Sequence, residues 1–377
     1  MWEEEDLTKL WILLAVSLAL AWLIDNQDKA LRSRGVERRE RLFTTLLTIV
    51  LVFFCGLRIW GNDTSTYLEI YVHLTPTLDR ITQANIPDFA EGFGFFFLTS
   101  LIKTLGFSTQ DYLLFYAAIT VPFYVLFVRH YSKSMVFGVF LMFTTGFYTF
   151  SMAAIKQTAA TGICLLAVTA ALERKWIRFF LLVGLASLFH PYAIIYLLVP
   201  LLMFKPWTAR TFFYVIAFMA AGFLLENLLG VVLDITDMLG AKYDEESFVG
   251  EGVNIFRVAV SFVPLILAAL YGKPLFKNSS RTDDLMFNMA MVNALIMFVG
   301  LFGTANYFAR LANYFLPAQV IVLPWIIRRT DPRDRAILLP GCIVGYLGYF
   351  IYENAIIRPF DSGYAHISLW EYLSSHF

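Results

Sequence analysis

Seven ionisable side chains lie within or next to long apolar stretches of this sequence, where each is costly to place and is therefore a candidate site residue. They are four cations, two carboxylates and one imidazole: Arg58, Lys156, Arg257, Arg310, Asp63, Glu91 and His190. Arginine presents a planar fork of donors that matches phosphate oxygens, and lysine adds a point charge. A carboxylate or an imidazole nearby could deprotonate an acceptor hydroxyl. The set therefore predicts a membrane-surface site for an anionic substrate such as a lipid-linked pyrophosphate.

Arg310 has the most distinctive surroundings of the seven. It shares one helical face with Asn306, Asn313 and Tyr314, which lie 4, 3 and 4 residues away. A polar stripe of this kind is hard to explain on a helix that faces lipid. We therefore expect this face to line a polar site.

The other candidates have structural alternatives. Arg58 and Arg257 could extend to lipid headgroups, and Glu91 could be an ordinary interfacial carboxylate. Asp63 could cap a short helix, since Thr66 and Glu69 beside it fit a capping box. Lys156, which lies among small residues, could form a structural ion pair. His190, which precedes Pro191, could be a turn histidine whose ring nitrogens are already hydrogen-bonded.

The composition predicts how these residues are positioned. The chain has 377 residues, of which 59% are hydrophobic and 15% charged, against about 45–50% and about 25% in soluble domains. The apolar residues come in continuous runs, which excludes a soluble enzyme and disfavours a β-barrel. The net charge of +0 gives no sign of nucleic-acid binding, and the three cysteines form no CxxC motif. No disulfide framework, metal or cofactor is predicted.

We predict an all-α polytopic membrane protein with about twelve transmembrane helices, since one span needs about 20 residues. The first run, 8–24, reads as an uncleaved span because no basic region precedes it. The run 92–107 is short for a span, and we expect it to be an interfacial or re-entrant helix. The twelve predicted spans are 8–24, 42–60, 111–128, 135–150, 153–172, 176–189, 191–204, 211–231, 254–271, 285–303, 307–327 and 336–352.

The basic residues predict the orientation of these spans. Segment 25–41 carries six cations and is expected to be cytoplasmic by the positive-inside rule. The later basic turns fall on the same side only if 92–107 does not cross. Both termini are then outside, and the candidates gather toward one polar cavity at the outer face. Residues 1–377 read as a single transmembrane domain with outer-face loops 61–110 and 232–252 and an outer tail, 353–377.

Several functions agree with an outward polar cavity. The sequence shows no Ser/His/Asp triad order, phosphate loop or HExxH motif. A transporter or flippase for lipid-linked oligosaccharides would place charges along both halves of a pathway. A glycan ligase, which moves a finished glycan to another acceptor, would use nearly the same set of residues. A membrane O-acyltransferase would need a histidine constellation near the inner face, which the sequence does not show.

Five short motifs, in order from about residue 56 to 315, resemble those of the EpsG family of polysaccharide polymerases, which is related to Wzy. Two of them depart from the family pattern, with Lys156 in place of the usual arginine and Tyr192 in place of a small hydroxyl residue. The motifs are Gly56-Leu57-Arg58 with Gly61-Asn62-Asp63 and Tyr67; Glu91-Gly92-Phe93; Ala154-Ile155-Lys156-Gln157; Phe189-His190-Pro191-Tyr192-Ala193; and Asn306-Tyr307-Phe308-Ala309-Arg310 with Tyr314.

The resemblance implies a bacterial plasma-membrane glycosyltransferase with a GT-C-like fold that makes exopolysaccharide or capsule. Such an enzyme joins undecaprenyl-pyrophosphate-linked repeat units at the extracytoplasmic face and releases undecaprenyl pyrophosphate. Its partners would be this lipid-linked oligosaccharide as donor and acceptor, membrane lipid, and chain-length regulator and flippase proteins, with no cofactor and no nucleic acid. The implied catalytic residues are Asp63, His190 and Glu91. The implied substrate-binding residues are Arg58, Lys156, Gln157, Arg310, Tyr67, Tyr314 and Arg257.

Overall fold

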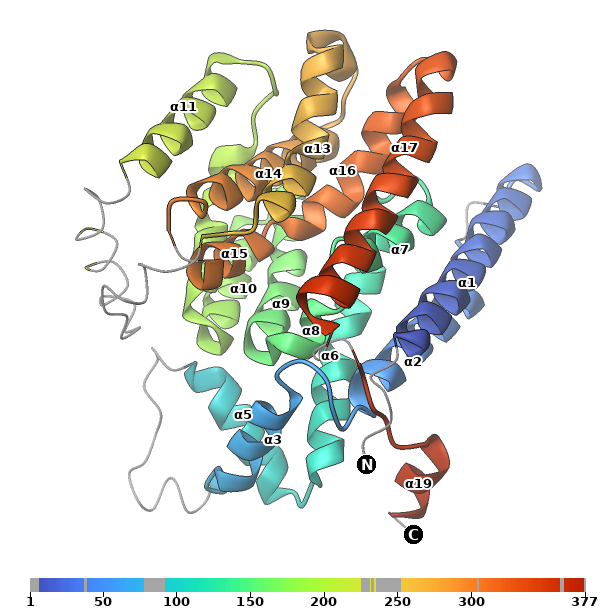
Figure 1. The fold of residues 1–377 in the computed structure, drawn as a ribbon, viewed down its shortest axis with the longest axis vertical. Helices are drawn as coiled ribbons and strands as arrows, with labels where there is room; N and C mark the ends of the chain where they lie inside the picture. Colours follow the sequence, from blue (N-terminus) through green and yellow to red (C-terminus); the bar gives the residue numbers. More distant parts are fainter. Residues whose placement is uncertain are drawn as a thin grey trace. The chain divides into compact units, whose positions relative to one another are not determined.

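The computed structural model describes residues 7–36, 39–77, 92–224, 231, 234, 252–303, 305–359 and 363–375, and these form an all-helical protein (Figure 1). Within this part of the chain the only β-type pairing is an isolated antiparallel bridge between Arg58 and His366. The all-α prediction is confirmed. The predicted outer loop 232–252 lies almost entirely outside the described residues.

The chain divides into two compact units. The first comprises Met1–Asp88, Gly92–Leu165 and Leu347–Phe377, and the second Phe89–Glu91 and Leu166–Tyr346. The helices that lie wholly in the first unit are α1 (Thr8–Ser33), α2 (Leu42–Gly56), α3 (Thr64–His73), α5 (Phe93–Thr104), α6 (Thr109–Tyr131), α7 (Met135–Thr144), α8 (Phe150–Ala153), the π-helix η5 (Tyr352–Ile357) and α19 (Leu369–Ser374). Within it, α6 packs against α2, α3, α5, α7 and α8.

The second unit is organised around α14 (Arg281–Val299), which packs against five other elements of that unit. Nearly every side chain of α14 is buried. The other elements are α10 (Trp176–Phe189), the 3₁₀ helix η2 (Pro191–Leu202), α11 (Ala209–Phe223), α13 (Ile255–Tyr271), the 3₁₀ helix η4 (Lys273–Phe276), α15 (Ala305–Asn313) and α16 (Leu316–Arg329). Two helices, α9 (Ile155–Leu172) and α17 (Pro332–Ile351), contribute residues to both units.

Local sequence signals explain where several helices begin. Ser108, Ser280 and Ser368 each form a capping box at the start of α6, α14 and α19, which satisfies backbone N–H groups of the first turn. At the end of α2, a Cβ added to Gly56 would lie 2.7 Å from the Cα of Leu114. Glycine at this position therefore allows α2 and α6 to approach closely.

The prediction of twelve full spans is not confirmed. Of the described helices, five are long and apolar enough to cross a bilayer, or six if one bent pair counts as a single span, and seven more apolar helices have 10–17 residues. The bent pair replaces the straight span expected at 307–327, because the chain turns by 55° between Asn313 and Leu316. Segment 25–41 is not a simple loop, since α1 continues to Ser33. Segment 92–107 forms α5, and its re-entrant placement stays a prediction.

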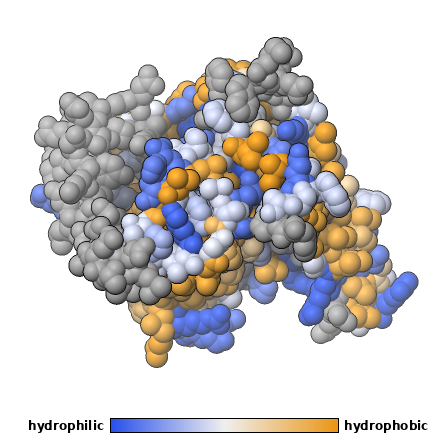
Figure 2. Space-filling view, turned by 90° about the horizontal axis from the view of Figure 1, so that it is seen from below, coloured by the Kyte–Doolittle hydropathy of each residue, from blue (hydrophilic) through white to orange (hydrophobic). Residues whose placement is uncertain are grey.

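Large apolar side chains are exposed on many helices, as expected for a protein that contacts lipid. Ile177 is 80% exposed and Val344 70%. Figure 2 shows hydrophobic patches beside hydrophilic ones on the face seen from below. Exposed apolar surface on this scale is unusual in soluble monomers and agrees with a membrane protein.

Candidate functional site

The structure places the sequence-predicted site residues in two groups, one in each unit. Glu91 lies outside the described residues. The first unit contains Arg58, Asp63, Tyr67, Lys156 and Gln157, and the second contains His190, Arg257, Arg310 and Tyr314.

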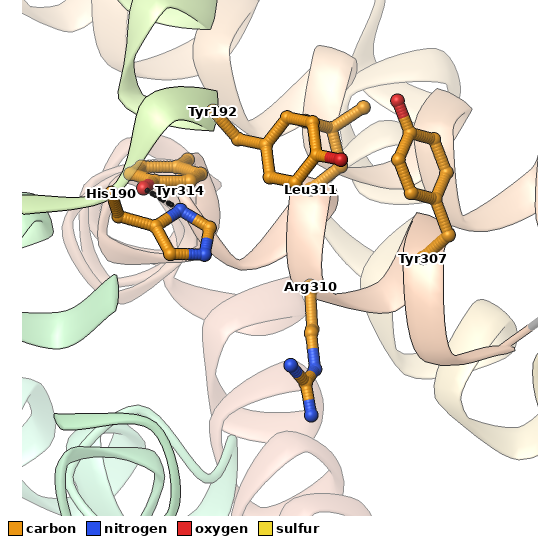
Figure 3. A pocket seen from close by; sticks show the side chains of 6 residues that line it. All are labelled: His190, Tyr192, Tyr307, Arg310, Leu311 and Tyr314. Carbon is orange, nitrogen blue, oxygen red and sulfur yellow. Dashed lines mark hydrogen bonds between the residues drawn. The ribbon is translucent and has the colours of Figure 1, made fainter. Parts of the chain in front are cut away.

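A pocket in the second unit brings three of the predicted residues together. His190, Arg310 and Tyr314 line it with three further side chains, those of Tyr192, Tyr307 and Leu311 (Figure 3). The Nδ1 atom of His190 lies 2.8 Å from the hydroxyl of Tyr314. The ring of Tyr192 meets that of Tyr307 edge-on, with centroids 5.6 Å apart. The pocket therefore combines a guanidinium and an imidazole with three phenol rings, which can bind an anionic group beside a ring-shaped one.

The backbone at His190 aims its imidazole into this pocket. His190 ends α10 in an extended conformation, with φ −149° and ψ 112°. Pro191 follows and starts η2 with the fixed φ that suits a first helical position. The expected break before Pro191 is present, and the histidine side chain bonds to a residue 124 positions away.

The bend between α15 and α16 places Arg310 and Tyr314 on the pocket wall. Such a break frees backbone carbonyls, which in a membrane must find other donors. The side-chain amide of Asn293 donates to the carbonyl of Ala312 at 2.7 Å, and the hydroxyl of Tyr196 donates to the carbonyl of Tyr314 at 2.7 Å. Asn293, Tyr196 and Tyr314 are fully buried. Two buried donors thus stabilise the bend.

Asn293 provides a test of this support. Replacing it with leucine should destabilise the protein by about 0.5–1.5 kcal/mol, because the buried carbonyl of Ala312 loses one of its two donors and keeps the N–H of Phe315. It should also slow turnover by about tenfold to a hundredfold, because a shifted bend misplaces Arg310. Asn288→Leu is the matched control, since Asn288 is equally buried on α14 but donates to Leu202 and Phe204. Thermal unfolding and turnover check both, and an equal loss of turnover in the two variants would contradict the specific role of the bend.

The predicted polar stripe around Arg310 is partly different in the structure. Tyr314 faces the pocket with Arg310 as expected, but Asn313 does not line it, and the side chain of Asn306 lies outside the described residues. Arg257 lies in the first turn of α13 and does not line the pocket either. Tyr307 and Leu311 line it instead. Tyr307 lies three residues before Arg310 and Leu311 lies three residues before Tyr314, so the spacing in the sequence places these side chains on one side of the helix.

In the first unit, Arg58 is held inside the protein. Its side chain is 1% exposed. Nε donates to the hydroxyl of Thr64 at 2.9 Å, Nη2 to the carbonyl of Met152 at 3.3 Å, and Nη1 to the carbonyl of Cys55. The alternative that Arg58 extends to headgroups is wrong. Its contacts connect the end of α2 to α3 and α8 and so fix the turn that precedes Asp63.

That turn presents Asp63 outward. Gly61 has φ 104° and Asn62 has φ 50°. Both backbone angles are positive, and residues other than Gly, Asn and Asp rarely adopt such angles. Asp63 occupies the N-cap position of α3, but its side chain makes no capping hydrogen bond and is exposed. The short helix after Asp63 is present, but Thr66 and Glu69 do not form a capping box, because α3 begins at Thr64 and not after Thr66. Asp63 is therefore exposed on a turn that the contacts of Arg58 hold in place.

Aromatic contacts connect α3, α5 and the start of α9. The Nζ atom of Lys156 lies 4.9 Å from the ring centroid of Phe96 and 5.9 Å from that of Phe95, a cation–π arrangement. Phe95 in turn meets Tyr67 edge-on at 6.2 Å. Gln157 is buried in the first turn of α9. Sequence reasoning missed both phenylalanines, because nothing in an aromatic-rich apolar run distinguishes them.

Among the described residues, no three His, Cys, Asp or Glu side chains gather as a metal site would require.

His366, beside Arg58, makes the stability of the tail sensitive to acid. Burial lowers the pKa of its imidazole from 6.5 to about 4. Between these two values the unfolded chain binds a proton that the folded chain does not, so stability is lost as the pH falls from 6.5 to 4. Wild type should therefore lose up to about 3 kcal/mol more than His366→Gln over this range. Thermal unfolding in detergent at stepped pH checks this, and identical pH dependence in both proteins would contradict it.

Comparison with protein families gives one match. The model of the EpsG family matches residues 41–365, which covers most of the chain and all the site residues described above. Comparison with curated proteins and with solved structures gave no match.

Proposed function

The chain belongs to the EpsG family, a family of Wzy-like polymerases, and from this premise we propose that it polymerises undecaprenyl-pyrophosphate-linked oligosaccharide repeat units. The reaction takes place at the extracytoplasmic face of the bacterial plasma membrane. The growing glycan leaves its carrier and joins the non-reducing sugar of the next unit, and undecaprenyl pyrophosphate is released. Membership of the family indicates a polysaccharide polymerase-like function, and the carrier lipid and the side of the membrane belong to the proposal.

The pocket of the second unit is the observation that supports this function most strongly. A pyrophosphate leaving group gains charge as its bond to the sugar breaks, and fixed donors lower the energy of that state. Arg310 supplies a bidentate donor at the pocket, and His190, bonded to Tyr314, supplies a group that can hold or move a proton. The phenol rings of Tyr192 and Tyr307 offer apolar faces with polar tips, which suit a sugar ring.

The residues of the first unit receive roles that follow from their exposure. Asp63 is exposed on a fixed turn, which supports a role as the base that deprotonates the acceptor hydroxyl. Lys156 keeps a partly exposed side chain at the start of α9, which suits an anion. The three donor nitrogens of Arg58 already have partners inside the protein, so its contacts favour a positioning role over contact with the pyrophosphate.

Four further assignments stay predictions. They are sugar binding or support of a cation by Glu91, and substrate binding by Gln157, Tyr67 and Arg257. Chain-length regulator and flippase proteins remain expected partners, and the termini are expected outside.

Transport of the lipid-linked oligosaccharide is the second candidate, and one observation favours it. The α15–α16 pair is a broken span that carries Arg310 beside the pocket, and transporters commonly bind substrates at broken helices. A ligase is chemically closer to the polymerase and differs only in the acceptor.

A reconstituted turnover assay tests the proposal. The purified protein in lipid vesicles is given its lipid-linked repeat unit, and glycan length is read on a gel together with released undecaprenyl pyrophosphate. A ladder with stoichiometric release of the carrier is expected. Movement of the substrate across the vesicle membrane with no joined units would overturn the polymerase and favour the transporter. Transfer of one finished glycan to a different acceptor would indicate a ligase.

A further inference from the structure

The C-terminal segment 363–375 pairs with the turn that carries Asp63, although more than 300 positions separate them in sequence. The backbone N–H of Ile59 donates to the carbonyl of Ala365 at 2.8 Å, and the N–H of Ile367 donates to the carbonyl of Leu57 at 3.1 Å. These bonds flank the antiparallel bridge between Arg58 and His366. The tail therefore forms backbone hydrogen bonds with the residues on both sides of Arg58, and these bonds hold that part of the chain in place.

Two side chains of the tail reinforce this pairing. Nε2 of His366 lies 2.9 Å from the carbonyl of Phe54, to which it donates, and the imidazole lies 4.3 Å from the Phe54 ring. The hydroxyl of Tyr364 accepts a hydrogen bond from the side-chain amide of Asn62. Asn62 is the residue with positive φ directly before Asp63. Tyr364 thus bonds to the left-handed residue that directly precedes Asp63.

The far end of the segment is anchored separately. Ser368 caps α19, and the hydroxyl of Tyr372 donates to the carboxylate of Asp111 on α6. Asp111 also closes the capping box at Ser108. The segment is therefore attached at one end to α6 and at the other to the turn 57–63.

We propose that residues 363–372 form a strap that positions Asp63, and that Tyr364 and His366 are positioning residues for the reaction. This inference rests on the proposed function, in which Asp63 is the base. A left-handed residue such as Asn62 has a less favourable backbone than its alternatives, so the turn needs outside contacts to stay in one conformation. The strap supplies them through the Tyr364 hydroxyl, the His366 imidazole and two backbone bonds.

The activity test uses variants that remove single bonds. Tyr364→Phe and His366→Leu should lower kcat about tenfold with KM changed less than twofold, because the base is misplaced while substrate binding elsewhere is intact. His366→Gln keeps a donor for the Phe54 carbonyl and should retain most of the activity. Tyr271→Phe is the matched control, since it removes a tyrosine hydroxyl bond to Asp334 in the second unit and should leave kcat unchanged.

Two further comparisons separate positioning from general stability. In an Asp63→Asn background, Tyr364→Phe should cause no additional loss of kcat, because the group that it positions is already disabled. The double variant Asn62→Gly with Tyr364→Phe should lose no more than Tyr364→Phe alone, because glycine removes the amide donor and still adopts the positive φ of this position. If the two substitutions in either comparison lowered kcat independently, so that their effects multiplied, the strap would not be a positioning device.

A spin label makes the test independent of catalysis. A nitroxide on a cysteine replacing the exposed Ser65, in a Cys342→Ala background, reports the mobility of α3 next to the turn. Cys55 and Cys164 are fully buried and should not react. The label should become more mobile in Tyr364→Phe and His366→Leu than in wild type. Unchanged mobility would overturn the strap, whereas a mobility increase in a protein that never polymerises would retain the strap and overturn the proposed function.

Discussion

Replacing Arg310 with alanine is expected to slow polymerisation at least about a hundredfold, which is the usual loss when one preorganised donor to a developing charge is removed. Arg310 lines the pocket with His190 and Tyr314, and its side chain extends away from the rings of Tyr192 and Tyr307 (Figure 3). Lysine keeps the charge at this position but loses the fork, so Arg310→Lys should recover only part of the rate. Initial rates of carrier release and glycan ladders on a gel measure both variants.

The control for this prediction is Arg178→Ala. Arg178 is an exposed arginine on α10, the helix that ends next to His190, so it tests whether any lost positive charge in this unit reduces the rate. It should leave turnover within about twofold of wild type. A ladder of normal length and rate from folded Arg310→Ala would remove Arg310 from the reaction and leave the function to other residues.

Replacing Asp63 with asparagine is expected to lower kcat by about 10²–10⁴, the range for loss of a general base. Asparagine has nearly the same shape as aspartate, and the side chain of Asp63 is exposed, so the variant should fold and bind substrate. Steady-state rates measure the loss of kcat, and thermal unfolding checks the fold.

Glu69→Gln is the paired control, because Glu69 is a second exposed carboxylate on α3, six residues further along. It should keep the wild-type rate. If Glu69→Gln and Asp63→Asn reduced the rate equally, the cause would be the negative charge of the helix surface and not a base at Asp63.

Apolar runs and their boundaries predicted the helices well, because a chain in lipid must satisfy its backbone hydrogen bonds internally. The runs at 176–189 and 191–204, for example, became α10 and η2 with the expected break at His190. The 55° bend at 313–316 was not predicted. Pro317 in the first turn of α16 favours a break at this point. Asn293 and Tyr196, from other helices, donate to the carbonyls at the bend, and hydropathy does not reveal these contacts.

The site was predictable where one helical face or one short turn carries it. Spacing alone joins Arg310 to Tyr314, whereas the bond between His190 and Tyr314 connects residues 124 positions apart. The burial of Arg58 was not readable, because an arginine at the end of an apolar run looks the same whether it extends to headgroups or bonds to backbone carbonyls. The pairing of residues 363–367 with residues 54–62 has no sequence pattern at all.

This pairing has a consequence for the order in which the protein matures. Phe54 emerges early during synthesis, but its partner His366 follows 312 residues later. At about 5–20 residues per second, translation separates the two by roughly 15–60 s. During that interval the turn before Asp63 lacks its C-terminal partner. A nascent chain, or one that stops before residue 363, would therefore insert its helices without completing the turn, and activity would begin only after residues 363–372 have been added.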